Sequence, residues 1–296
     1  MSYLKKYEYV IAVKDYGGIS QAAEKLGISQ PTFSKYIKKI EAELKIELFD
    51  RSTLPIRLTQ AGECFVNAGK KLIDVDKQLQ KQLGEIKSQE GSVIRVGISP
   101  SRSPYTMPRI IELYRKRNSA GRIVIEERTT AELCKRLGEG ELDLVISILD
   151  ADTESFERIE LFDESILIAA PRQQCENNPN PSDLLKRATL ISIGRGQVMW
   201  QTLNTILDGM NLPRPSIECQ SIESALSLVK KGLGVTLVPS YIARDKDNAI
   251  KFLPLDGNGG AKHERKICIF YRKEQFLTAS EKEFIQCVVE SERKRG

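Results

Sequence analysis

A stretch of small polar and basic side chains stands at the start of one predicted helix. Residues 29–35 have the sequence SQPTFSK, and their amide, hydroxyl and ammonium groups suit a polar, negatively charged partner. From residue 28 to residue 40 the chain has three lysines and no acidic residue. This local charge predicts a surface that faces phosphate groups, although a solvated lysine face would have the same composition.

The cysteine and histidine content argues against a metal site and against a catalytic pair. The six cysteines are scattered without C-x-x-C spacing, and His263 is the only histidine, so neither a zinc site nor a cofactor is expected. A Ser-His or Cys-His pair would have to use His263, which lies in the Gly-rich segment GNGGAKHERK. We therefore expect no enzyme. Cys175 and Cys219 could form a redox pair, but their local sequences give no further support.

The composition fits an ordinary globular protein with two or three domains. The 296 residues are 41% hydrophobic and 29% charged, with a formal net charge of +5. No apolar run of about 20 residues occurs, so no membrane span is expected. The N-terminus lacks the basic start and apolar run of a signal peptide, which predicts a cytoplasmic location.

Two short helices joined by a tight turn must position the polar residues. Apolar spacing predicts a helix over residues 3–14, a second helix with Ser20 as its N-cap, and a third after the N-cap Ser29. Gly27 ends the second helix. The third helix has apolar residues at spacings of 4, 3 and 4, which form one buried stripe: Phe33, Ile37, Ile40 and Leu44. The polar residues fall outside this stripe, so the pattern predicts a helix-turn-helix.

A β-wing and a long helix are expected next. Residues 48–49 and 56–58 are strand-like pieces around a proline-bearing turn, with Arg51 and Arg57 near the two arms. Thr59 is expected to cap a helix that runs to about residue 88 and carries an apolar seam: Ala61, Phe65, Ala68, Leu72, Val75, Leu79, Leu83 and Ile86. Such a seam needs a partner helix and predicts dimerisation, unless the helix packs on its own core.

From residue 93 onward, short apolar strands alternate with helices. The first series predicts strands over residues 93–99, 122–128 and 142–148, and the second series over residues 189–193, 216–220 and 235–240. FERIELF and SILIAAP are predicted as two further strands between the series. Alternation of this kind is typical of parallel sheets. Two such units predict two lobes with a ligand-binding cleft between them.

In its motifs and their order, the sequence resembles the LysR-type transcriptional regulators over essentially its whole length. The strongest part is residues 20–62, which have the family's elements in order: a polar residue before AA, SQP-x-x-S, I-x-x-I-E, LF-x-R and LT-x-AG. The segments LGEGELDLVIS (137–147) and VKKGLGVTLVPS (229–240) add weaker support.

The resemblance implies an α/β protein with three parts. These are a winged helix-turn-helix DNA-binding domain (1–58), a linker and dimerisation helix with a hinge (59–92), and a two-lobed α/β effector-binding domain similar to periplasmic binding proteins (93–296). Lobe I would comprise residues 93–162 and 268–296, and lobe II residues 163–267, so the chain would cross between lobes near residues 162 and 267.

The implied function is transcriptional regulation by promoter binding, modulated by a small anionic effector. The implied partners are double-stranded DNA, that effector, and further copies of the chain, as a homodimer or homotetramer through the helix over residues 59–88. The alternative is a cytoplasmic small-molecule-binding protein or an enzyme that uses the α/β cleft.

The resemblance also implies which residues contact DNA. The residues expected to face the major groove are Gln30, Pro31, Thr32, Ser34 and Lys35. Glutamine can pair with adenine edges, and proline and the threonine methyl can contact a thymine methyl. Lys35 stands where the family more often has arginine, and lysine lacks the planar fork that binds guanine. Phosphate contacts are expected from Lys38, Arg51, Arg57 and the amide-rich helix start at Thr59.

The effector site is expected where polar residues follow strands of the two lobes. In lobe I these are Ser99, Ser101, Arg102 and Ser103 at a helix start, which favours an anion, with Thr129 and Thr130 after the next strand. In lobe II they are Gly194, Arg195, Gln197, Gln220 and Ser221. Arg102 and Arg195 facing one cleft would suit a negatively charged molecule, unless these residues only cap helices. Met199 and Trp200 are predicted to pack under their helix.

Overall fold

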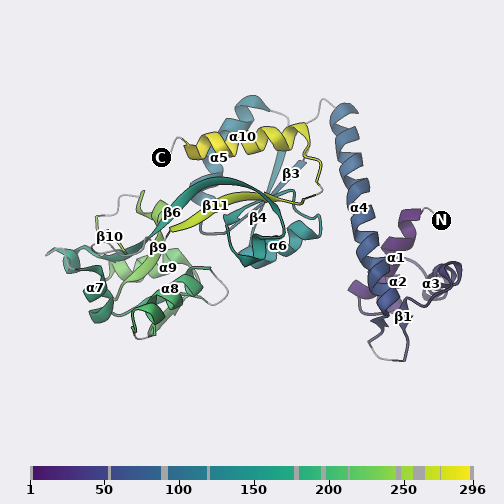
Figure 1. The fold of residues 1–296 in the computed structure, drawn as a ribbon, viewed down its shortest axis with the longest axis horizontal. Helices are drawn as coiled ribbons and strands as arrows, with labels where there is room; N and C mark the ends of the chain where they lie inside the picture. Colours follow the sequence, from purple (N-terminus) through teal and green to yellow (C-terminus); the bar gives the residue numbers. More distant parts are fainter. Residues whose placement is uncertain are drawn as a thin grey trace. The chain divides into compact units, whose positions relative to one another are not determined.

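The computed structural model describes residues 3–52, 55–87, 93–118, 121–176, 180–194, 198–212, 214–244, 248–255, 264–273 and 275–293. The chain forms two compact units, residues 1–88 and 89–296 (Figure 1). Among the described residues, every helix is too short or too polar to cross a membrane.

The first unit consists of helices and one small β-hairpin. Its elements are α1 (Tyr3–Asp15), α2 (Ile19–Lys25), α3 (Gln30–Leu44), β1 (Phe49–Asp50), β2 (Arg57–Leu58) and α4 (Gln60–Lys87). The predicted stripe of α3 packs into the core of this unit, where Phe33, Ile37 and Ile40 are buried. Leu44, the last residue of the stripe, is 44% exposed because it lies in the final turn of the helix.

The start of α2 differs from the prediction. The helix begins at Ile19 with Gly18 as its N-cap, because the Gly18 carbonyl already accepts the first helical bond from the Ala22 amide at 3.1 Å. Ser20 was therefore wrong as the cap and lies inside the helix. Ser29 is the N-cap of α3 as predicted, but its hydroxyl donates to the Thr32 hydroxyl at 2.8 Å instead of accepting from a backbone amide.

The wing and the start of α4 are joined by short contacts. β1 and β2 pair antiparallel, with Phe49 opposite Leu58, which confirms the predicted hairpin. Thr59 caps α4 as predicted, because its hydroxyl accepts from the Gly62 amide at 3.0 Å. A Cβ at position 62 would lie 2.0 Å from the Leu48 carbonyl oxygen, so only glycine allows the helix to approach the chain before the wing this closely.

The predicted seam of α4 divides into two halves. Near its start, Phe65 stacks on Tyr7 of α1 at a centroid distance of 4.5 Å, so this half packs on the unit's own core. Further along, the apolar side chains are exposed: Leu72, Val75, Leu79 and Leu83. The alternative of packing on the chain's own core therefore holds for Ala61 and Phe65 only. Ala68 is already exposed, and the fully buried side chain of this part of α4 is Val66, which the predicted seam did not include.

The second unit begins with the predicted alternation of strands and helices. β3 (Val93–Ile98) pairs in parallel with β4 (Arg122–Glu127) and with β5 (Leu144–Ile148), which confirms the parallel sheet. α5 (Ser103–Arg117) and α6 (Thr130–Gly138) connect these strands. α10 (Ala279–Arg293) packs against α5, where Phe284 and Tyr114 meet edge to face at 5.5 Å.

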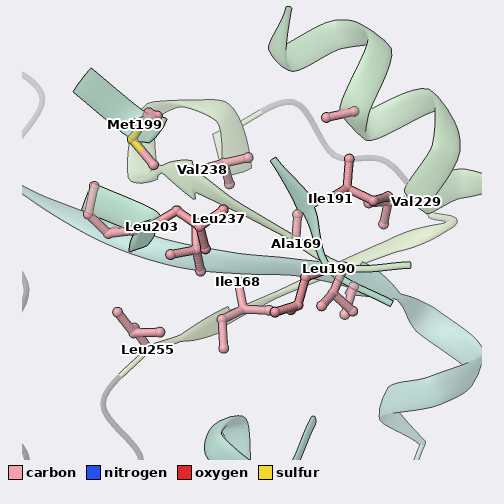
Figure 2. Packing of buried hydrophobic residues seen from close by; sticks show 14 of the residues in the cluster. Ile168, Ala169, Leu190, Ile191, Met199, Leu203, Val229, Leu237, Val238 and Leu255 are labelled. Atoms are coloured by element: carbon pink, nitrogen blue, oxygen red, sulfur yellow. The ribbon is translucent and has the colours of Figure 1, made fainter. Parts of the chain in front are cut away.

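A second group of elements surrounds the largest core cluster. These elements are α7 (Pro181–Arg187), β7 (Ile191–Ile193), α8 (Val198–Gly209), β8 (Ile217–Cys219), α9 (Ile222–Lys230), β9 (Thr236–Pro239) and β10 (Ile250–Pro254). β7 and β8 pair in parallel, as predicted. Figure 2 shows Met199 and Leu203 of α8 on the strand side chains of this core, including Leu237.

One long strand replaces the two strands expected from FERIELF and SILIAAP. β6 (Glu157–Pro171) pairs first with β11 (Glu264–Tyr271) and then with β9 and β10 (Figure 1). The acidic pair Asp163–Glu164 suggested a break between two strands. The strand continues because both carboxylates are paired across it, Asp163 with Lys266 at 3.1 Å and Glu164 with Arg265 at 2.7 Å.

Candidate DNA-binding surface and effector cavity

The front of α3 exposes the polar residues that the sequence singled out. Gln30, Pro31, Thr32, Lys35 and Lys38 are exposed and Ser34 is half-buried, while the apolar stripe of the same helix is buried. A shallow concavity on this helix is lined by Thr32, Lys35, Tyr36, Lys38, Lys39 and Ala42. The helix therefore presents hydroxyl, amide and ammonium groups on one solvent-facing side, as DNA recognition requires.

The wing adds two arginines to this unit. Arg51 follows β1 and donates to the Glu41 carboxylate of α3 at 2.6 Å, and Arg57 lies in β2 opposite Asp50. The Ser52 hydroxyl and amide, with a smaller contribution from Arg57, lower the pKa of the Asp50 carboxyl. Both arginines are exposed.

Thr59 has a structural role that the prediction of free amides did not anticipate. Its amide donates to the Leu48 carbonyl at 3.0 Å and its hydroxyl donates to the Glu47 carbonyl at 2.7 Å. The Thr59 amide is therefore already engaged within the protein and cannot also donate to a phosphate in this arrangement.

The second unit contains a cavity of about 450 Å³ at the starts of α5, α6 and α9. Seven of the predicted effector residues line it: Ser99, Ser101, Arg102, Thr129, Thr130, Gln220 and Ser221. The other lining residues are Pro100, Pro104, Arg128, Ser147, Ile148, Met199, Ile222, Glu223, Pro239 and Arg265. Three helix N-termini, which favour negative charge, therefore meet one cavity with a partly apolar wall.

Arg102 is not a free cation in this cavity. It is 4% exposed, donates to the Glu164 carboxylate at 2.7 Å, and stacks over the Tyr241 ring at 4.6 Å. Arg265 donates to the same Oε2 atom of Glu164, through Nε at 2.8 Å and Nη2 at 2.7 Å. One buried carboxylate oxygen thus holds two guanidinium groups.

The protonation of this cluster follows from its charges. Burial by itself would raise the pKa of Glu164, but the charges of Arg102 and Arg265 outweigh burial and hold the pKa below its ordinary value. Burial also raises the pKa of Tyr241, although Arg102 and the Ser101 hydroxyl act in the opposite direction. Glu164 is therefore ionised at neutral pH and Tyr241 is a neutral phenol.

Some predicted effector residues lie away from the cavity wall. Ser103 is 5% exposed as the first residue of α5, and its amide donates to the Ser99 carbonyl at 3.0 Å, as does the Arg102 amide at 3.1 Å. These two amides are therefore not free for an anion. Gly194 lies behind Gln220, whose Oε1 would be 2.9 Å from a Cβ at position 194. Arg195 and Gln197 lie outside the described residues.

Two of the lining residues also cap helices. Thr129 forms a capping box with Glu132 at the start of α6, and the Thr129 hydroxyl lowers the pKa of the Glu132 carboxyl. Ser221 caps α9 by accepting from the Ser224 amide at 3.2 Å. The capping alternative therefore applies to both residues, while both still border the cavity.

Sequence reasoning missed several residues of the wall. Ser147 is 6% exposed and shares a hydrogen bond of 3.0 Å with the Thr130 hydroxyl. Arg265 donates through Nη1 to the sulfur of Met199 at 3.4 Å, so Met199 borders the cavity as well as packing in the core. The position of Ser147 at the end of β5 was the one available signal, because ligands bind beyond strand ends.

The thiols are mostly shielded from solvent. Cys134, Cys175, Cys268 and Cys287 are buried, Cys219 is intermediate, and Cys64 is exposed. Burial raises the pKa of the Cys134 thiol to about 12 and also raises the pKa of Cys175. A raised pKa suppresses the reactive thiolate. Within the described residues no three His, Cys, Asp or Glu side chains are grouped as metal ligands.

A winged helix-turn-helix followed by an α/β unit with a ligand-sized cavity defines a DNA-binding regulator with an effector-binding module. Residues 4–63 match the model of the bacterial regulatory helix-turn-helix proteins of the lysR family, and residues 87–293 match the LysR substrate binding domain. The chain belongs to the LysR family of transcriptional regulators, which confirms the resemblance, the fold class and the general function.

Individual relatives support this assignment over most of the chain. The chain is 27% identical to the hydrogen peroxide-inducible genes activator of Escherichia coli O157:H7, covering 85% of this chain and 84% of that protein. The structure of a full-length OxyR variant from Pseudomonas aeruginosa is similar, with a TM-score of 0.68 and 26% identity over 99% of this chain and 95% of that one. Full-length CbnR in complex with its target DNA shares the fold, with a TM-score of 0.62 and 20% identity over 97% and 99% of the chains.

Proposed function

We propose that this protein binds promoter DNA through the front of α3 and the two arms of the wing. The observation that carries the proposal is the separation of faces on α3, where Phe33 and Ile37 are buried while Gln30, Thr32 and Lys35 are exposed. The base-contacting residues would be Gln30, Pro31, Thr32, Ser34 and Lys35, and the phosphate-contacting residues Lys38, Arg51 and Arg57. A cytoplasmic location follows from this proposal, because the chromosome lies there.

Substitution of Gln30 tests the reading of bases. A well-placed pair between a side chain and a base accounts for about 1–3 kcal/mol of discrimination. Gln30→Ala should therefore reduce the preference for the duplex upstream of the protein's own reading frame over a scrambled duplex by about fivefold to 150-fold, with nearly unchanged affinity for the scrambled duplex. The measurement is fluorescence anisotropy at several salt concentrations. An equal loss on both duplexes would contradict a base-reading role.

We also propose that the exposed half of the α4 seam pairs with a second copy of the chain. Leu72, Val75 and Leu79 are 41%, 61% and 48% exposed, and such a stripe on one helix face is stabilised by a partner helix. Leu72→Asp combined with Leu79→Asp should give monomers in sedimentation velocity. Lys77→Asp with Gln80→Asp, off the stripe on the same helix, should leave the mass unchanged. If the double leucine variant still forms dimers, the exposed stripe of α4 is not the dimer interface.

The cavity of the second unit is proposed to bind a small organic anion without changing it chemically. Three arginines, Arg102, Arg128 and Arg265, face two carboxylates, Glu164 and Glu223, which leaves one net positive charge near the cavity. Pro100, Pro104, Ile148, Ile222 and Pro239 supply an apolar wall. A carboxylate on an apolar body would match both features. The relatives are transcription regulators, which supports binding instead of catalysis.

A thermal-shift screen tests this proposal on the full chain. Aliphatic and aromatic monocarboxylates are each compared with their uncharged amides, because a ligand that binds the folded form raises its melting temperature. The proposal expects shifts with acids and none with amides. Arg128→Gln should abolish the shift, and Arg122→Gln, at the other end of β4, should retain it. Equal shifts in melting temperature with acids and amides would show that the cavity does not select a negatively charged ligand.

Effector control would act through a population shift. An effector changes DNA binding only if it binds two arrangements of the assembled protein with different affinities. Oxidation of thiols is the competing signal, since a relative is named as an activator of hydrogen peroxide-inducible genes. In this chain Cys175 is buried with a raised pKa, which disfavours a redox pair with Cys219 and favours a bound small molecule as the signal.

A further inference from the structure

Glu41 of α3 holds two different groups with its two carboxylate oxygens. Oε1 accepts from the backbone amides of Leu48 at 3.0 Å and Phe49 at 3.3 Å. Oε2 accepts from Nη2 of Arg51 at 2.6 Å. The Glu41 side chain is 11% exposed although it lies on the helix that carries the proposed DNA contacts. An acidic group so close to basic residues would ordinarily weaken binding to phosphate.

The two amide contacts fix the base of the wing. Phe49 is the first residue of β1, so the amides bound by Glu41 lie at the point where the wing begins. On the other side of the same segment, the carbonyls of Glu47 and Leu48 accept from Thr59 at the start of α4. The segment from residue 47 to residue 49 is thus held by α3 through its amides and by α4 through its carbonyls.

The contact with Arg51 fixes a guanidinium group at the surface. Arg51 is 41% exposed, and Glu41 occupies only one of the five N–H donors of its guanidinium. Lys38, Lys45 and Arg51 border one concavity together with Glu41 and Glu47, so three cations and two carboxylates line it. A guanidinium already held in place loses less conformational entropy when it binds phosphate.

We propose that Glu41 is a positioning residue for DNA binding, which holds Arg51 so that its remaining N–H groups contact a DNA phosphate. The inference rests on the proposed function, in which Arg51 is a phosphate contact. It assigns to an acidic side chain a favourable effect on affinity for a polyanion. The residue acts through Arg51 and does not itself contact DNA.

Glu41→Gln separates the two roles of the side chain. The amide oxygen of glutamine can still accept from the Leu48 and Phe49 amides, whereas its NH₂ group cannot accept from Arg51. The wing base should remain, and Arg51 should be released. Affinity for duplex DNA is expected to fall by about threefold to tenfold, and the slope of log K against log salt by about one for each lost phosphate contact. A lost negative charge alone would change affinity in the opposite direction.

The matched control removes the same charge elsewhere on α3. Glu43 instead forms an ion pair with Lys6 of α1. Glu43→Gln should therefore leave the affinity unchanged or slightly higher. The measurement uses full-length protein with the duplex upstream of its reading frame and with a scrambled duplex, because a phosphate contact affects both. Thermal unfolding of each variant establishes that it is folded.

Arg51→Gln distinguishes failure of the inference from failure of the proposed function. The double variant Glu41→Gln/Arg51→Gln should bind like Arg51→Gln alone, because Glu41 acts through that arginine. Glu41→Gln protein that binds as tightly as wild type, with an unchanged salt slope, would overturn the inference. An Arg51→Gln protein with unchanged affinity would instead remove Arg51 from the DNA-binding surface.

Arg51→Lys gives a second route if Glu41→Gln does not fold. Lysine keeps the positive charge but lacks the planar fork that can hold a carboxylate and a phosphate together. The inference expects weaker binding than wild type with a reduced salt slope. Binding equal to wild type would mean that charge alone matters at this position, and the inference would be wrong.

Discussion

Two arginine–carboxylate groups in this chain have the same chemistry and different surroundings. At the wing, Arg51 is 41% exposed and pairs singly with Glu41. At the cavity, Arg102 and Arg265 are 4% and 14% exposed and both donate to Glu164, which is 1% exposed. The first group leaves most guanidinium donors in contact with solvent, whereas the second has its charges enclosed by protein.

The surroundings decide what each group can contribute. An exposed ion pair contributes about 0–1 kcal/mol to stability, so the wing pair serves mainly to orient a side chain. A buried carboxylate that holds two cations cannot be removed without leaving both cations unpaired in a poorly solvated place. The buried pairing at the cavity is therefore expected to matter for the stability of the second unit, whereas the proposed role of the exposed pairing at the wing is to orient Arg51.

Removal of Glu164 is expected to have the largest effect. Glu164→Gln should reduce the free energy of unfolding of the second unit by about 3–5 kcal/mol, because Arg102 and Arg265 lose their shared counter-charge. Chemical denaturation of the full-length protein measures this change. Glu160→Gln is the control on the same strand, since its ion pairs with Arg158 and Lys266 are exposed, and it should unfold like wild type. An equal loss of unfolding free energy in the two variants would contradict the different roles assigned to the buried and the exposed ion pairs.

Removal of one buried arginine should cost less than removal of the shared carboxylate. In Arg102→Gln, Glu164 keeps Arg265 as its partner, so the loss is one charged hydrogen bond and the contact with the Tyr241 ring. A hydrogen bond to a charged group is typically worth about 1.5–3 kcal/mol, and the expected loss of stability is of that size. The same denaturation experiment gives the comparison. A loss larger than that of Glu164→Gln would contradict the role of Glu164 as the common partner.

Acid should weaken the buried group through protonation of Glu164. Its pKa in the folded chain lies below its ordinary value of 4.5, so the unfolded chain binds this proton more readily. The stabilisation of the fold by ionised Glu164 is complete above the ordinary pKa of 4.5. It is lost as the pH falls from there through the lower pKa of the folded chain. The difference in unfolding free energy between wild type and Glu164→Gln should therefore be constant near neutral pH and shrink below about pH 4.5. A difference that stays constant down to pH 3 would contradict the lowered pKa.

The first unit was predictable in most respects because its signals are local. The stripe of α3, the turn at Gly27 and the cap at Thr59 each depend on residues a few positions apart. The start of α2 was misplaced because Gly18, with no side chain to signal a cap, begins the helix through its carbonyl. The role of Glu41 was not predicted, since its partners depend on how the chain after α3 folds back.

The cavity was predictable only in part because its charges come from distant positions. The polar residues after the strands were found, since strand ends are visible in sequence. Arg265 could not be found, because it meets Glu164 across 101 positions of sequence, and β11 is placed by its pairing with β6. The sequence also did not reveal that Arg102 is already paired, because its carboxylate partner Glu164 lies 62 positions away.

Glu164 lies at a particular place along the long strand β6. The strand runs from Glu157 to Pro171, with a register shift where Ile267 and Cys268 pair with Phe162 and Glu160, and it exchanges its partner β11 for β9 and β10 along its length. Glu164 lies beside the point where β11 is replaced by β9 and β10 as the partner of β6, so the carboxylate that holds Arg102 and Arg265 also stands at the junction of the two parts of this strand.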